Sequence, residues 1–108
     1  IGSALERHAW FPRKTNAELA HVVSRREIDL VVWERGCGIT LACGTGACAA
    51  ASAARLRGLT QSRVTVQLDG GALEIEVLED GRVLMTGPGE TSYAGVIEPN
   101  RLAAASAP

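Results

Sequence analysis

A run of small residues in the middle of the chain constrains the fold more than any other feature. From Gly44 to Arg57 the sequence reads GTGACAAASAARLR, and Gly58 follows it. Alanine has the highest helix propensity, and a glycine after a basic last turn is typical of a helix end. We therefore predict a helix that begins near Gly44 or Thr45. Because its side chains are so small, strands can pack closely around it, as in a barrel filled by a helix.

The segments on both sides of this helix have the patterns of β-strands. β-Branched and aromatic residues cluster in short runs, or apolar residues alternate with polar ones, in six segments: 17–24, 28–34, 63–68, 73–77, 83–86 and 93–97. The turn Asp69-Gly70-Gly71 joins two of them into a hairpin. Phe11-Pro12 ends a short helical or irregular opening segment. The architecture that we predict is α+β, with a curved antiparallel sheet or partial barrel wrapped around one central helix.

The composition allows one small domain and excludes several classes of partner. The 108 residues are 46% hydrophobic, and we assign residues 1–100 to the domain and 101–108 to a flexible tail. A net charge of −1 with interspersed signs, and no apolar run near the roughly 20 residues of a membrane span, predict neither a nucleic-acid nor a membrane partner. Three cysteines crowded together predict free thiols and a cytoplasmic protein, and they lack the spacing of a metal site.

The densest candidate site lies where the central helix begins. Cys43 comes directly before it, where the helix dipole and the unpaired amides of the first turn stabilise a thiolate. Gly44 and Gly46 leave those amides uncovered, so a substrate carboxylate could bind beside the thiol. The alternative is structural: Cys43 is then a small buried residue, and the glycines only allow close packing.

Two charged residues end the preceding strand, and two further thiols lie nearby. Glu34 could hold a substrate ammonium or accept a thiol proton, and Arg35 could bind a carboxylate through two N–H groups. A solvated charge pair is the alternative interpretation. Cys48 lies among alanines and is predicted to belong to the core, whereas Cys37 is a loop thiol between glycines.

The stretch WERGCGITLACGTGACAAA, residues 33–51, resembles the signature around the second catalytic cysteine of diaminopimelate epimerases. Similarity extends to LERH, FP and TN upstream and to LDGG and MTGP downstream. These enzymes are amino-acid epimerases that use no cofactor and no metal. The resemblance implies that Cys43 and Glu34 are catalytic and that the substrate contacts five residues: Asn16, Glu34, Arg35, Gly44 and Thr45.

The resemblance also implies a two-cysteine acid/base mechanism and one half of the family's fold. One thiolate removes the α-proton of diaminopimelate, and an opposing thiol delivers a proton to the other face. Each cysteine comes from one of two pseudo-symmetric halves, and the first signature is not in this sequence, which opens at Ile1. We therefore expect a C-terminal half that is inactive alone, with the missing N-terminal half as its partner. The activity would serve lysine and peptidoglycan biosynthesis.

Two alternatives stay open. The chain could belong to another amino-acid racemase or epimerase of the same superfamily that needs no pyridoxal phosphate. It could also be a non-catalytic half-barrel that forms a homodimer. Asn16 and Arg35 together favour a substrate with a second, distal carboxylate, and hence diaminopimelate.

Overall fold

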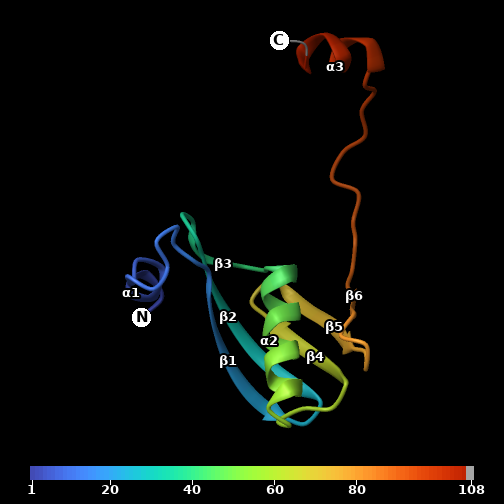
Figure 1. The fold of residues 1–108 in the computed structure, drawn as a ribbon. Helices are drawn as coiled ribbons and strands as arrows, with labels where there is room; N and C mark the ends of the chain where they lie inside the picture. The colour runs from blue at the N-terminus through green and yellow to red at the C-terminus, as the bar shows by residue number, and fades with distance from the viewer. Residues whose placement is uncertain (107–108) are drawn as a thin grey trace.

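The computed structural model describes residues 1–106 and has α+β architecture, as predicted. Three helices and six strands follow one another along the chain: α1 (Gly2–Glu6), β1 (Ala17–Ser24), β2 (Glu27–Glu34), β3 (Gly38–Thr40), α2 (Gly44–Leu56), β4 (Arg63–Leu68), β5 (Gly71–Val77), β6 (Val83–Thr86) and α3 (Pro99–Ser106). The strands form one curved sheet, and α2 lies across its concave face (Figure 1). The sheet is not closed into a barrel.

The sheet is mixed, with one parallel pair among antiparallel ones. Its order is β1-β2-β4-β5-β6, and β3 pairs with the C-terminal end of β2. β2 and β4 run parallel, with Glu27 opposite Thr65 and Asp29 opposite Gln67. The predicted antiparallel arrangement holds for the other strand pairs and fails at this one. The reason is that α2 carries the chain from one strand back to the start of its neighbour, which places the two strands in the same direction.

The core lies between α2 and the concave face of the sheet. Every second residue of β2 and β4 points toward the helix, and these side chains are buried together with Ile75 of β5: Ile28, Leu30, Val32, Val64, Val66 and Leu68. α2 presents Ala47, Ala51 and Ala54 to them, at the spacing of one helix face. The small side chains of α2 thus bring its backbone close to the sheet, and they fix the position of its first turn.

α1 is held against the C-terminal end of β2 by one carboxylate. Trp33 Nε1 donates to Glu6 Oε2 at 2.7 Å, and the Gly36 amide donates to Glu6 Oε1 at 3.0 Å. These two hydrogen bonds lower the pKa of the buried Glu6 carboxyl below its usual value. Glu6 therefore fixes the turn that follows Glu34, and with it the position of Arg35.

The C-terminal segment extends away from the sheet. After β6 the chain runs to α3, which stands apart from the other elements (Figure 1). The Cα radius of gyration is 17.4 Å, against about 13 Å for a compact domain of this length. The strand predicted at 93–97 is not formed, because no described strand lies beside this segment to pair with it. Residues 101–106 of the predicted tail belong to α3, and 107–108 lie outside the described residues.

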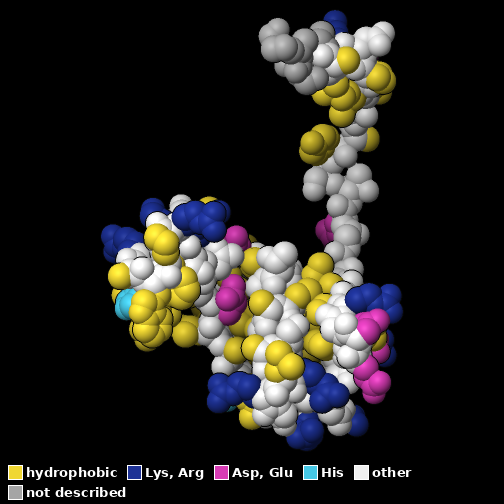
Figure 2. All heavy atoms as spheres, viewed as in Figure 1, with side chains coloured by type: hydrophobic (Ala, Val, Ile, Leu, Met, Phe, Trp, Pro, Cys, Tyr) yellow, Lys and Arg dark blue, Asp and Glu magenta, His cyan; other side chains and the backbone are white. Residues whose placement is uncertain are grey.

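The surface carries several exposed apolar side chains near the chain's N-terminus. Figure 2 shows hydrophobic atoms gathered around α1 and the adjoining end of the sheet. Ile1 and Trp10 are both more than four-fifths exposed there. Within residues 1–106, no helix is both long and apolar enough to cross a membrane.

Candidate functional site

Cys43 occupies the N-cap position of α2. Its backbone is extended, with φ −147° and ψ 105°, so the helix begins at the next residue. The Gly46 amide donates to Cys43 Sγ at 3.3 Å, and Thr45 Oγ1 lies 3.5 Å from the same sulfur. The half-buried Cys43 side chain thus caps the first turn of the helix, with its sulfur accepting the hydrogen bond of the Gly46 amide.

The first turn of α2 leaves two backbone amides available. The Gly46 amide bonds to the Cys43 sulfur, and the Ala47 amide donates to the Cys43 carbonyl at 2.9 Å. The Gly44 and Thr45 amides have no hydrogen-bond partner among residues 1–106. Two unpaired amides at the positive end of a helix can bind a carboxylate. The arrangement can therefore place an anion beside a thiol.

Gly44 allows a side chain of β6 to approach the helix start closely. A Cβ at this position would lie 3.0 Å from Met85 Sδ on β6, closer than ordinary van der Waals contact. The absence of a side chain lets Met85 cover one side of the helix start. β6 thereby contributes to the wall of the candidate site.

Asn16 and Arg35 are brought together across the end of the β1–β2 hairpin. Asn16 Oδ1 accepts a hydrogen bond from the Arg35 backbone amide at 2.8 Å, and Arg35 Nη1 donates to the Arg13 carbonyl at 3.3 Å. They line an open, polar hollow of about 360 Å³ together with Lys14, Thr15 and Glu18. Two cationic side chains in this hollow suit a ligand carboxylate.

The Glu34 carboxylate is oriented by the adjacent short strand. Thr40 Oγ1 of β3 donates to Glu34 Oε1 at 2.6 Å across the β2–β3 pair. Glu34 is half-buried, and its second carboxylate oxygen has no hydrogen bond to the described part of the chain. Within residues 1–106, no hydrogen bond or ion pair joins Glu34 to Cys43, so the two side chains are positioned separately.

The other two thiols differ from Cys43 in their surroundings. Cys37 is exposed in the turn before β3, as the sequence predicted for a loop thiol. Cys48 is half-buried and packs against the core, and burial, followed by the neighbouring Cys43, raises the pKa of its thiol. Cys43 is the cysteine that caps the helix.

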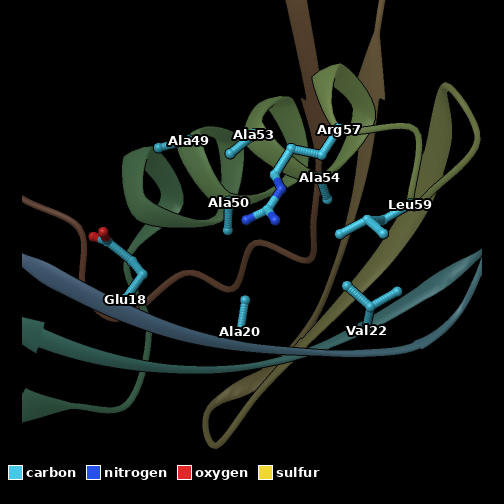
Figure 3. Close-up of a pocket in the computed structure, with 9 residues that line it drawn as sticks. All are labelled: Glu18, Ala20, Val22, Ala49, Ala50, Ala53, Ala54, Arg57 and Leu59. Atoms are coloured by element: carbon cyan, nitrogen blue, oxygen red, sulfur yellow. The ribbon is translucent and has the colours of Figure 1, made fainter.

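Glu18 is a residue of this region that the sequence analysis missed. It is the second residue of β1, and the two-residue period of the strand places it on the same face as Ala20 and Val22, toward α2. Figure 3 shows its side chain rising from β1 at one end of a groove of about 380 Å³ between β1 and α2. The strand period was the signal that could have identified it.

Comparison with known proteins gives consistent results. Residues 1–91 match the model of the diaminopimelate epimerase family. The diaminopimelate epimerase of Desulfitobacterium hafniense is 58% identical over 97 residues, which make up 90% of this chain and 34% of that protein. The enzyme of Caulobacter vibrioides is 55% identical over 95 residues, 87% of this chain and 33% of that protein. The chain thus spans about a third of the length of these curated relatives.

The fold also has a match among solved structures. A phenazine biosynthesis protein of the PhzF family from Bacillus anthracis superposes with a TM-score of 0.54 at 21% identity. The match covers 79% of this chain and 29% of that chain. At this identity the likeness concerns the fold alone.

Proposed function

Because this chain belongs to the diaminopimelate epimerase family, we propose that it carries one of two catalytic cysteines of an enzyme that interconverts LL- and meso-diaminopimelate. The observation that carries the proposal is the Cys43 thiol at the start of α2, beside two unpaired amides. The reaction would serve lysine and peptidoglycan biosynthesis in the cytoplasm.

The chemistry requires a base on one face of the α-carbon and an acid on the other. Cys43 as thiolate takes the α-proton, which leaves a carbanion, or as thiol it delivers a proton to that carbanion from its own face. The Gly44 and Thr45 amides bind the adjacent carboxylate and stabilise the negative charge that develops on it. No cofactor is needed for either step.

The remaining residues hold the substrate in place. Glu34 accepts hydrogen bonds from the ammonium group at the reacting carbon. Arg35 and Asn16 bind the carboxylate at the far end of the substrate, Arg35 through its guanidinium charge and Asn16 through its side-chain NH2 group. The Asn16 Oδ1 meanwhile accepts the Arg35 backbone amide and fixes its position. A rigid grip on both ends aligns the reacting carbon with the sulfur.

One cysteine supplies an acid or a base on one face of the α-carbon only. We propose that the second thiol comes from the two thirds of the relatives' length that this chain does not span. Alone, the chain can at most exchange the α-proton and return it to the face from which it came. Net inversion by the isolated chain is therefore expected to be undetectable.

The test is a hybrid enzyme in which this chain replaces the matching third of the Desulfitobacterium hafniense diaminopimelate epimerase. With LL-diaminopimelate in deuterated water, we expect conversion to the meso form with deuterium at the α-carbon. Cys43→Ala should lower the rate by roughly a hundredfold or more. Cys37→Ala, an exposed thiol outside the proposed site, is the matched control and should retain activity.

Three results would contradict the proposal. They are a folded hybrid that does not epimerise, a fully active Cys43→Ala hybrid, and robust conversion by the 108-residue chain alone. In the last case, a rate that rises with the square of chain concentration would indicate a homodimer with two copies of Cys43 across one site.

A further inference from the structure

The Glu18 carboxylate lies between the two parts of the candidate site. Its side chain lines the polar hollow that also contains Lys14, Asn16 and Arg35. It also lines the groove between β1 and α2, so it borders the hollow on one side and the helix on the other. Among the residues that line these two spaces, Glu18 is common to both.

The same carboxylate reaches the first turn of α2. A Cβ placed on Gly46 would lie 2.9 Å from Glu18 Oε1 and 3.2 Å from Cys43 Sγ. The carboxylate oxygen and the sulfur are therefore no more than about 6 Å apart, the sum of these two distances. Figure 3 shows the carboxylate turned toward the N-terminal part of α2. The missing side chain of Gly46 provides the space that it occupies.

Glu18 has no hydrogen-bond or ion-pair partner within residues 1–106. Its carboxylate makes no hydrogen bond and no ion pair with any described residue, although the side chain is half-buried. The positive end of α2 stabilises its charge in part. A partly desolvated carboxylate without a hydrogen-bond donor is nevertheless unfavourable, and a cationic ligand would remove that cost.

The hollow therefore presents opposite charges that do not pair with each other. Lys14 and Arg35 supply cations and Glu18 an anion, without an ion pair between them in the described part of the chain. A free amino-acid group carries one carboxylate and one ammonium on the same carbon. Separate anion and cation sites in one hollow are complementary to such a zwitterion.

We propose that Glu18 binds the ammonium group at the end of the substrate whose carboxylate Arg35 and Asn16 hold. This inference rests on the proposed function and adds a specificity-determining residue to it. Glu18 distinguishes a substrate with a second amino-acid end from one that has only a second carboxylate. In this assignment Glu34 binds the other ammonium group of the substrate, at the reacting carbon.

The test uses the hybrid enzyme with Glu18→Gln, which keeps the shape of the side chain and removes its charge. Loss of a charge-assisted hydrogen bond should raise KM for LL-diaminopimelate roughly tenfold or more. kcat should stay within about threefold, because the contact is the same in the ground and transition states. Glu18→Asp should recover part of the affinity. Glu27→Gln, an exposed carboxylate on β2, is the matched control and should leave both constants unchanged.

The outcomes separate this inference from the function on which it rests. An unsubstituted hybrid without epimerase activity refutes the proposed function, and the inference falls with it. An active hybrid in which Glu18→Gln leaves KM within twofold overturns the Glu18 assignment alone. So does a fall in kcat at constant KM, which would place the carboxylate in proton transfer with Cys43. A lower urea midpoint for Glu18→Gln than for Glu27→Gln would make its role structural, and would also overturn the assignment.

Discussion

Replacing Gly46 with alanine should separate the stability of α2 from the geometry of the site. Gly46 is the third residue of the helix and is buried. An alanine in a helix is worth about 0.5–1 kcal/mol of stability over glycine. The new Cβ would meet Glu18 Oε1 at 2.9 Å and Cys43 Sγ at 3.2 Å. Both of these groups must move.

The two shifts have different costs. The new Cβ would also lie 3.3 Å from Glu18 Cγ, so the flexible Glu18 side chain must change its rotamer as a whole, at about 0.5–1.5 kcal/mol. The sulfur must give way by a few tenths of an ångström, which weakens its hydrogen bond from the Gly46 amide. The gain and the cost nearly cancel, so the free energy of unfolding should change by less than about 1 kcal/mol. Misplacement of two site groups should nevertheless lower kcat/KM of the hybrid enzyme roughly ten- to a hundredfold.

Urea unfolding of the 108-residue chain and steady-state kinetics of the hybrid measure the two effects. Ala49→Gly, on the exposed side of the same helix, gives the intrinsic difference between the two residues and should destabilise by about 1 kcal/mol. A Gly46→Ala chain destabilised by more than about 2 kcal/mol would show that the carboxylate and thiol cannot yield. Unchanged kinetics would show that their positions do not matter for the reaction. Either result would refute the reasoning.

Three further predictions concern individual side chains. The hydrogen bonds from Trp33 and Gly36 lower the pKa of the Glu6 carboxyl in the folded chain. Its stabilising contribution is therefore complete above the carboxyl's pKa in the unfolded chain, and it is lost as pH falls through the pKa in the folded chain. Glu6→Gln should flatten the acid side of a plot of unfolding free energy against pH. In timed alkylation of the folded chain at neutral pH, Cys43 should react first and Cys48 last, because burial raises the pKa of the Cys48 thiol. Peptide mass mapping gives the order of labelling, and early labelling of Cys48 would contradict the prediction. Ile75→Ala should cost about 2–5 kcal/mol in urea unfolding, since Ile75 is fully buried against α2, and a loss below about 1 kcal/mol would mean that the core collapses around the gap.

Local patterns predicted most of the elements and the place of Cys43. The alanine-rich run predicted the start of α2 at Gly44, and the alternation of apolar and polar residues predicted the hairpin of β4 and β5. Cys43 was correctly expected at the helix start, because a helix boundary depends on residues that are close together in the chain. The three-residue β3 was missed, because Gly36 and Gly38 on either side of Cys37 are turn signals and mask so short a strand.

Pairing between distant segments was harder to predict. Strand periodicity gives the face of each residue but not the direction of its neighbour, so the parallel pairing of β2 with β4 was not predicted. Tyr93–Ile97 has a strand composition, yet strand formation requires a partner. In the candidate site, the hydrogen bond from the Arg35 amide to Asn16 depends on the β1–β2 register, which the sequence does not encode locally.

The parallel pairing also determines when the site can exist during folding. The β1–β2 and β4–β5 hairpins join neighbouring segments and can form early, whereas β2 meets β4 only after the chain through α2 has closed. Asn16 and Glu18 belong to the first hairpin, and Cys43 belongs to that connecting chain. The first turn of α2 and the polar hollow should therefore come together late, when this long-range contact forms. Truncation of Ile28 or Val66 to alanine, at positions that line neither, should therefore lower the activity of the hybrid enzyme by weakening this contact.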